Sequence, residues 1–183
     1  MDAEWKRRLV RGFRWADPGP WSAHYLTDRS GWWRDPVLLA GIGPALAEEF
    51  RADEPTLVIG PERSGLLLGP LVATALGVGF AEAYKDISDA VVGDQLHIRA
   101  TSPDHRGRTG TLSVRRRWLD PSDRVLVVDD WIETGAQATA LAGIVADADA
   151  TYLGTAVILN ALPPHASERL TVRGLLHPGD LDD

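Results

Sequence analysis

Two adjacent carboxylates follow a short, wholly apolar stretch in the second half of the chain. Residues 125–128 read VLVV, Asp129 and Asp130 come directly after them, and Thr134-Gly135 opens a helix-like stretch. The start of a helix leaves backbone N–H groups unpaired and carries the positive end of the helix dipole, and both favour a phosphate. Gly135 lets the backbone approach such a ligand closely. Because two carboxylates repel a bare anion, the combination is typical of a site for sugar hydroxyls or for a metal ion that bridges to phosphates.

The same residues also fit a structural interpretation. Thr134 and Gln137 have the spacing of a capping box, in which a hydroxyl and a side chain three residues later pair with the backbone at a helix start. Asp129 and Asp130 would then be the solvated end of a strand. The residues alone leave both interpretations open.

A second loop, residues 60–65, has the sequence Gly-Pro-Glu-Arg-Ser-Gly and follows the apolar run Thr56–Ile59. Successive backbone N–H groups in such a loop can form an anion nest, and Arg63 adds a guanidinium. Lys85 ends the next strand-like stretch, 78–84, and supplies another cation. Taken by itself, this loop is as typical of an ordinary turn as of an anion site.

Composition restricts the class of protein. The chain has 183 residues, of which 44% are hydrophobic and 25% charged, as expected for a folded globular domain. The absence of cysteine excludes a disulfide scaffold, a thiolate zinc site and a cysteine nucleophile. A net charge of −7 argues against a nucleic-acid partner. No apolar run approaches the ~20 residues of a membrane span, and no signal peptide is visible, so we expect a cytoplasmic protein without a membrane partner.

Strand-like and helix-like stretches alternate along most of the chain. Helices are expected at 1–15, 36–50, 65–76 and 135–147, and strands at 56–59, 78–84, 95–99, 111–117, 124–128, 151–159 and 170–176. This alternation predicts an α/β fold with a central, mainly parallel sheet flanked by helices. In such sheets ligands bind beyond the carboxyl ends of the strands, where both loops described above lie.

The first 35 residues are rich in tryptophan, with five of the seven Trp within the first 33 positions. Trp5, Leu9 and Phe13 are four residues apart and predict an amphipathic surface helix docked by its aromatic edge, with a basic patch for nucleic acid or membrane as the alternative. We expect one domain, 1–183, in which 1–35 is an extension, 36–160 the core and 161–183 a closing segment.

The motifs resemble those of a known family. Residues 125–137, with four apolar residues, two acidic residues and a loop around Thr-Gly, resemble the phosphoribosyl-pyrophosphate-binding motif of type I phosphoribosyltransferases. Residues 57–85 resemble the first half of the adenine and xanthine members. The resemblance implies a Mg²⁺-dependent, homodimeric enzyme of purine salvage. It would transfer ribose 5-phosphate from phosphoribosyl pyrophosphate to a nucleobase, with a small hood formed by the terminal segments 1–35 and 161–183.

The resemblance also implies a set of site residues. Asp129 and Asp130 would hold the ribose hydroxyls, directly or through Mg²⁺ bound with the pyrophosphate. The 5-phosphate loop would consist of Glu133, Thr134, Gly135, Ala136 and Gln137, and the pyrophosphate site of Glu62, Arg63, Ser64, Gly65 and Lys85. Arg106 would belong to a catalytic loop that closes over the donor, so that Glu133, Lys85 and Arg106 are the catalytic candidates.

Three positions depart from the family pattern. Gln137 stands where family loops often end in threonine, so an amide would replace a hydroxyl. Glu133 puts a negative charge beside a phosphate, either as a general acid/base for the purine or as a spectator. Trp131 is bulkier than the usual aliphatic residue, which favours packing over stacking on the base.

Two other functions remain open on the sequence. One is a non-catalytic, nucleotide-sensing regulator of the same fold, which the basic helix at Lys6–Arg14 would serve. The other is a hydrolase acting on phosphoribosyl compounds. The accepted base is not readable from the residues, because fold alone does not determine substrate.

Overall fold

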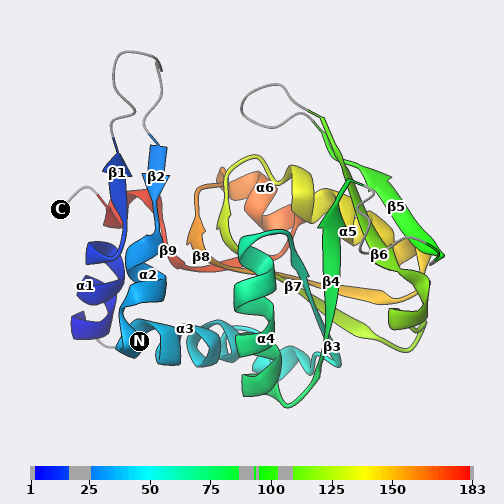
Figure 1. The fold of residues 1–183 in the computed structure, drawn as a ribbon, viewed down its shortest axis with the longest axis horizontal. Helices are drawn as coiled ribbons and strands as arrows, with labels where there is room; N and C mark the ends of the chain where they lie inside the picture. Colours follow the sequence, from blue (N-terminus) through cyan, green and yellow to red (C-terminus); the bar gives the residue numbers. More distant parts are fainter. Residues whose placement is uncertain (1–2, 17–25, 87–92, 94, 103–108, 182–183) are drawn as a thin grey trace.

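The computed structural model describes residues 3–16, 26–86, 93, 95–102 and 109–181. A seven-stranded sheet in the order β5-β6-β4-β3-β7-β8-β9 forms its centre (Figure 1). The strands of this sheet are β3 (Leu57–Pro61), β4 (Gly79–Lys85), β5 (Leu96–Ala100), β6 (Thr111–Arg115), β7 (Arg124–Ile132), β8 (Thr151–Asn160) and β9 (Val172–Leu176). The strands from β4 through β9 in this order are parallel to their neighbours, whereas β6 is antiparallel to both β4 and β5. The expected α/β fold with a mainly parallel sheet is confirmed.

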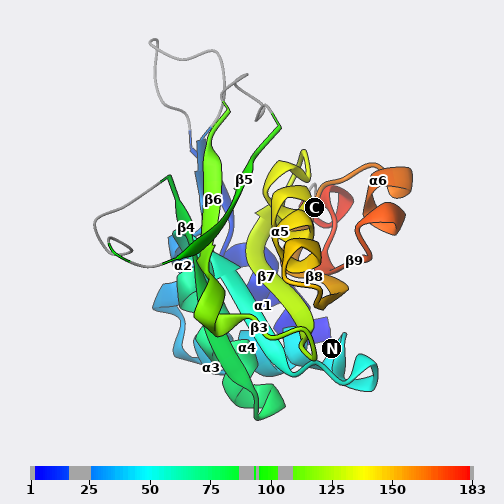
Figure 2. The same cartoon turned by 90° about the vertical axis from the view of Figure 1, so that its right-hand side faces the viewer.

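Helices cover both faces of the sheet (Figure 2). The helices are α1 (Ala3–Arg11), α2 (Ser30–Arg34), α3 (Pro36–Glu48), α4 (Ser64–Leu76), α5 (Ala136–Asp147) and α6 (Pro164–Arg169). Side chains of β7 alternate between the two faces: Leu126 and Val128 join the buried cluster of α3 and α4, and Val125 and Val127 join that of α5. Helices α4 and α5 lie on opposite faces of the sheet. The loops that precede them therefore diverge from the adjacent strands β3 and β7 and leave a crevice at the carboxyl ends of these strands.

Strand β7 is longer than the sequence indicates. The apolar run ends at Val128, but the strand continues through the acidic pair to Ile132. Strand β8 remains available as a pairing partner, with Asp129 opposite Val157 and Trp131 opposite Leu159. The backbone is therefore satisfied by the neighbouring strand, and both aspartates lie within regular β-structure.

The N-terminal segment packs on the core through its aromatic side chains. Leu9 and Trp32 are fully buried in the same cluster as α3, and the Trp32 indole N–H donates to the Leu9 carbonyl at 2.8 Å. The docked amphipathic helix expected at 1–15 is found as α1, whose buried residue is Leu9, but it ends at Arg11 and residues 14–16 form β1 instead. A hairpin of β1 (Arg14–Ala16) and β2 (Leu26–Asp28) follows and was not predicted.

The C-terminal tail contributes to the main sheet. Strand β9 pairs in parallel with β8 as the edge strand, and Leu175 and Leu176 join the core cluster of α3 and α4. The sequence suggested a closing segment at 161–183, but β9 within this range is a strand of the main sheet and belongs to the core. None of the described helices is both long and apolar enough to cross a membrane.

Candidate functional site

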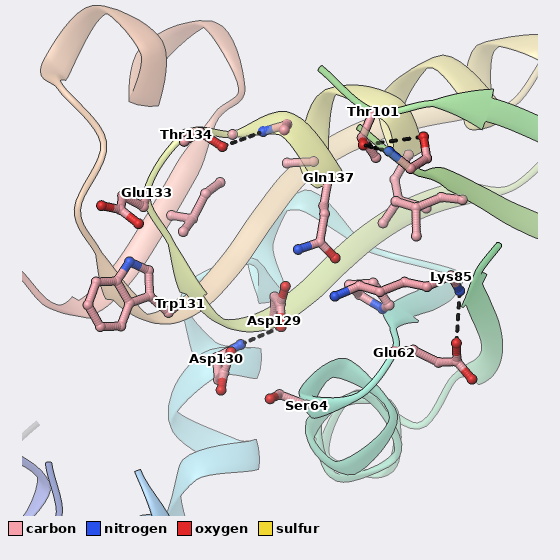
Figure 3. A pocket seen from close by; sticks show the side chains of 18 of the residues that line it. Glu62, Ser64, Lys85, Thr101, Asp129, Asp130, Trp131, Glu133, Thr134 and Gln137 are labelled. Carbon is pink, nitrogen blue, oxygen red and sulfur yellow. Dashed lines mark hydrogen bonds between the residues drawn. The ribbon is translucent and has the colours of Figure 1, made fainter. Parts of the chain in front are cut away.

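A cleft of about 980 Å³ lies at the carboxyl ends of β3, β4 and β7 (Figure 3). Its volume is at the upper end of the range for small-molecule sites. The sequence-predicted residues that line it are Glu62, Arg63, Ser64, Lys85, Asp129, Asp130, Glu133, Thr134, Gly135, Ala136 and Gln137. We call the part formed by these residues the cleft floor. Of the remaining predicted residues, Gly65 is absent from the lining and Arg106 lies outside the described residues.

The loop after β3 is fixed by a carboxylate and by two glycines. The Glu62 carboxylate accepts the Lys85 backbone N–H at 2.8 Å, and the Glu62 N–H donates to the Ala83 carbonyl at 2.9 Å. A Cβ on Gly60 would lie 2.1 Å from the Gly65 carbonyl oxygen, so the backbone of the loop closes directly onto the first turn of α4. Glu62 and Gly65 thus shape the loop, and Glu62, Arg63 and Ser64 border the cleft.

The acidic pair combines burial with mutual repulsion. The Asp130 N–H donates to Asp129 Oδ1 at 2.9 Å (Figure 3). Burial, and next the neighbouring Asp130 charge, raise the pKa of Asp129 well above its ordinary value, while the Lys85 charge acts in the opposite direction. Asp130 is in an ion pair with Arg29, with Nη1 and Oδ2 2.7 Å apart. The two carboxylates therefore face different cations, one on β4 and one in the N-terminal segment.

The loop before α5 is a left-handed turn rather than a capping box. Gly135 is the N-cap residue of α5 with φ of 74°, and the helix begins at Ala136. Thr134 Oγ1 accepts the Ala136 N–H at 3.3 Å, but no capping hydrogen bond of the predicted kind forms. The capping-box interpretation is wrong, because the positive φ of Gly135 turns the backbone before the helix starts. The first amides of α5 consequently border the cleft, as an anion site requires.

Gln137 points from the start of α5 toward Asp129 (Figure 3). Its Oε1 is buried without a hydrogen-bond partner among the described residues. A buried polar atom of this kind is costly unless something pairs with it, and a ligand in the cleft is one such partner. The Gln137 amide thus borders the cleft at the start of α5, and its assignment to the 5-phosphate loop stays a prediction.

Glu133 and Trp131 lie on one side of Asp129, and Lys85 lies on the other (Figure 3). The Trp131 ring centroid lies 5.9 Å from that of Phe13 and 5.9 Å from that of Trp15. Packing is therefore one role of Trp131, as expected, although its ring also borders the cleft. Glu133 is exposed on the same side.

Residues that sequence reasoning missed form a further part of the lining. Trp15, Thr27 and Arg29 come from the hairpin and the turn after it, and we call them the N-terminal wall. Their residue types carry no motif, and the contact between Arg29 and Asp130 joins distant parts of the chain. The Trp-rich composition indicated packing onto the core, but no local signal identified these three side chains.

Most arginines of the basic stretch 99–117 have structural partners. Arg99 pairs with Asp147, Arg115 Nη1 lies 3.2 Å from Glu82 Oε2, and Arg116 donates to the Leu96 carbonyl at 3.1 Å. The Arg117 guanidinium lies 5.2 Å from the Trp118 ring centroid. The strand expected at 111–117 ends at Arg115, and Arg116–Trp118 form a short 3-10 helix. Arg63 and Lys85 are the cleft-lining cations of the floor.

The carboxylates of the floor suit one kind of metal ion. The described residues contain no group of three or more His, Asp or Glu side chains that could enclose a metal. Mg²⁺ is commonly held by one or two carboxylates together with water and substrate phosphates. The donor set of Asp129 and Asp130 therefore fits a Mg²⁺ ion that arrives with a phosphorylated substrate.

Comparison with known proteins identifies relatives of the whole core. The sequence profile of the family described as "Phosphoribosyl transferase domain" matches residues 34–170. The chain is 28% identical to a xanthine phosphoribosyltransferase of Bacillus cereus over 143 residues, 77% of this chain and 71% of that protein. It is 33% identical to an adenine phosphoribosyltransferase of Natranaerobius thermophilus over 128 residues, 69% of this chain and 71% of that protein.

Solved structures agree with this result. The adenine phosphoribosyltransferase of Rhodothermus marinus superimposes with a TM-score of 0.79 at 27% identity, covering 96% of this chain and 99% of that one. The enzyme of Trypanosoma brucei, solved with AMP, pyrophosphate and ribose 5-phosphate, gives a TM-score of 0.78 at 23% identity, covering 100% of this chain and 84% of that one. With three quarters of its length matched by the profile and its cleft at the expected strand ends, the chain belongs to the phosphoribosyl transferase domain family.

Proposed function

We propose that this protein transfers ribose 5-phosphate from phosphoribosyl pyrophosphate to a purine base and releases pyrophosphate. The observation that carries the proposal is the convergence of two loops and an acidic pair on one cleft, in a chain whose relatives are named adenine and xanthine phosphoribosyltransferases. Each loop suits a phosphorylated end of the donor, and the acidic pair between them suits the ribose. The identity of the purine is left to experiment.

In this proposal the floor holds the donor at three points. Asp129 and Asp130 accept hydrogen bonds from the ribose hydroxyls. The amides after Gly135 and the Thr134 hydroxyl bind the 5-phosphate. Lys85 lies on the other side of the acidic pair from Thr134 (Figure 3), Arg63 borders the same cleft, and both bind the pyrophosphate, whose charge grows as the glycosidic bond breaks. Arg106 would add a further cation from its loop.

Most of the catalysis then comes from positioning and from stabilising the leaving group. The reaction proceeds through an oxocarbenium-like sugar, so a fixed cation beside the departing pyrophosphate lowers the barrier. Mg²⁺ bound with the donor would neutralise part of the same charge, held by Asp129 and Asp130 directly or through water. Glu133, an exposed residue of the cleft lining, is the candidate general acid/base for the purine nitrogen.

The basic helix that suggested a nucleic-acid-binding regulator has most of its charge neutralised by ion pairs. Three basic residues of α1 are engaged in ion pairs: Lys6 with Asp180, Arg7 with Glu4 and Arg8 with Asp35. These pairs reduce the positive field that phosphate binding needs. No feature of the described residues favours the hydrolase. The homodimer implied by the family resemblance remains a proposal, and sedimentation equilibrium measures it directly.

An acceptor panel tests the proposed function. The protein is incubated with phosphoribosyl pyrophosphate, Mg²⁺ and one of adenine, hypoxanthine, guanine, xanthine, uracil or orotate, and pyrophosphate release is recorded. We expect base-dependent release with at least one purine. Release of ribose 5-phosphate without any base would support the hydrolase instead. Binding of the donor with no turnover on any base would support the regulator.

Glu133→Gln separates the two roles of Glu133. If the carboxylate is the general acid/base, turnover falls by ~10²–10⁴ while donor binding is kept. Unchanged turnover would make Glu133 a spectator.

A further inference from the structure

The ion pair between Arg29 and Asp130 links the N-terminal segment to the acidic pair of the floor. The Asp130 side chain is 6% exposed and that of Arg29 30% exposed, and the two atoms that meet are 2.7 Å apart. An ion pair this short at a nearly buried carboxylate differs from the solvated pairs of a protein surface, which contribute little. Arg29 is therefore part of the electrostatic environment of the candidate ribose site.

Strand geometry explains why Arg29 reaches Asp130 and not Asp129. Along β7, Leu126 and Val128 face the cluster that contains Trp32 and α3, whereas Val125 and Val127 face α5. Successive side chains of a strand point to opposite faces, so Asp130 continues the first set. That face is the one on which the N-terminal segment packs.

The backbone around Arg29 is anchored. The Asp28 carboxylate accepts the Ser30 N–H at 2.9 Å, and the Arg29 carbonyl accepts the Trp32 N–H at 3.1 Å. Trp32 itself is fully buried and donates to the Leu9 carbonyl. The guanidinium is thus attached to a turn that the core holds in position, so its contact with Asp130 is preorganised.

The contact between Arg29 and Asp130 offsets part of the negative charge of the floor. Two adjacent carboxylates repel each other and also repel the phosphates of a donor sugar. The Lys85 charge acts on Asp129, and Arg29 pairs with Asp130 through Oδ2. A carboxylate offers about four lone-pair sites on its two oxygens, so one contact with Arg29 does not exhaust its capacity to accept a hydroxyl.

We propose that Arg29 is a positioning residue for the donor sugar, which acts through Asp130 by holding its carboxylate oriented toward the ribose hydroxyls. The proposal rests on the proposed function, because it assumes that the floor binds a phosphorylated pentose. It adds a residue outside the sequence motifs to that site. In this proposal the N-terminal segment lines the cleft and, through Arg29, also contributes to binding of the donor.

Calorimetric titration with ribose 5-phosphate tests the proposal without metal and without turnover. We expect Arg29→Gln to weaken binding on the order of tenfold, because Asp130 loses its partner. Arg29→Lys, which keeps the charge, should recover part of this loss. Arg34→Gln is the matched control, since Arg34 is an exposed arginine at the end of α2 in the same segment. It should bind as the unchanged protein does.

A double-mutant cycle with Asp130→Asn shows whether Arg29 acts through Asp130. If it does, Arg29→Gln adds little to the loss already caused by Asp130→Asn. In steady-state kinetics, Arg29→Gln should raise the KM for phosphoribosyl pyrophosphate about tenfold and leave kcat and the KM for the base nearly unchanged. A purely structural residue would lower the thermal midpoint without this separation of parameters.

The outcomes distinguish this inference from the function on which it rests. If the unchanged protein binds neither ribose 5-phosphate nor phosphoribosyl pyrophosphate, the proposed function and the inference both fall. If it binds them and Arg29→Gln binds equally well, Arg29 has only a structural role. Tighter binding by Arg29→Gln would mean that the guanidinium competes with the sugar for Asp130, and that result also overturns the inference.

Discussion

The cleft floor consists largely of backbone-rich loops at the ends of β3 and β7, whereas the N-terminal wall consists of three side chains carried in from residues 14–29. The floor gains its shape from short local contacts, such as Gly60 against Gly65 and Glu62 against the Lys85 amide. The wall gains its shape from long-range packing of aromatic rings. The floor residues lie in short consecutive stretches of the sequence, whereas the wall depends on how a distant segment docks.

Lys85→Ala tests the cations of the floor and has the largest expected effect of the four variants compared below. Removing a fixed cation beside the leaving group should lower kcat by ~10²–10³. Stopped assays of pyrophosphate release with the best purine measure this change. Arg51→Ala is the control, because Arg51 pairs with Glu48 on the surface and should leave kcat unaltered. Equal turnover of Lys85→Ala and the unchanged protein would remove Lys85 from the catalytic residues.

Gly135→Ala tests the loop that precedes α5. A Cβ at Gly135 would lie 2.8 Å from Leu170 Cδ1 and would also disfavour the positive φ. We expect ribose 5-phosphate to bind about tenfold more weakly, because a cost on the order of 1–2 kcal/mol falls on the phosphate-binding conformation.

Gly77→Ala is a matched control for this change. Gly77 also has φ of 74°, but a Cβ there meets nothing within 4 Å and lies at the end of α4, which is outside the cleft lining. Both variants should lose stability, and only Gly135→Ala should lose affinity. Similar affinity losses in both would show that general destabilisation, rather than the loop, controls binding.

Trp15→Ala tests the wall. Trp15 is 53% exposed and borders the cleft, so we expect its loss to raise the KM for the purine about threefold to tenfold, on the scale of a stacking contact of ~1 kcal/mol. Binding of ribose 5-phosphate should not change. Trp118→Ala removes an equally exposed indole beyond the cleft, at 53%, and should alter neither quantity. A change in donor affinity alone would assign Trp15 to the floor.

Asp129→Asn has the smallest expected effect, a gain in the thermal stability of the folded protein. The raised pKa means that folding disfavours the charged carboxylate, so the folded protein holds the proton to higher pH than the unfolded chain. Above the raised pKa this costs stability, and below the ordinary carboxyl pKa the cost disappears. We therefore expect Asp129→Asn to raise the thermal midpoint by a few degrees at pH 8.5, with a smaller gain at pH 5. A gain independent of pH would contradict the assigned cause.

The accuracy of the sequence-based prediction follows the same division. The floor was predictable because buried strand, acidic pair and glycine loop occur within residues 125–137, where local chemistry restricts each residue type. The continuation of β7 to Ile132 was not, because polarity at Asp129 and Asp130 is usual for the end of a strand. The pairing with β8 that sustains the strand is a tertiary contact. Likewise the left-handed Gly135 replaced the capping box, since spacing alone cannot distinguish the two.

The wall shows the limit of such reasoning most clearly. The spacing of Trp5, Leu9 and Phe13 correctly indicated residues that dock on the core, although Phe13 lies just beyond the end of α1 at Arg11. The partner of Arg29 could not be found this way. An arginine in a loop pairs with whichever carboxylate the fold brings near, and that carboxylate lies on β7.

The ring cluster that joins Trp131 to Phe13 and Trp15 has a practical consequence. Two indoles border the space that a purine would enter, and indole fluorescence responds to the polarity and to the ring systems around it. The protein thus carries an intrinsic optical reporter at the mouth of its binding site. Comparing the emission of the unchanged protein with that of Trp15→Phe during a titration separates the signal at the cleft from that of the other tryptophans, without a dye or a second enzyme.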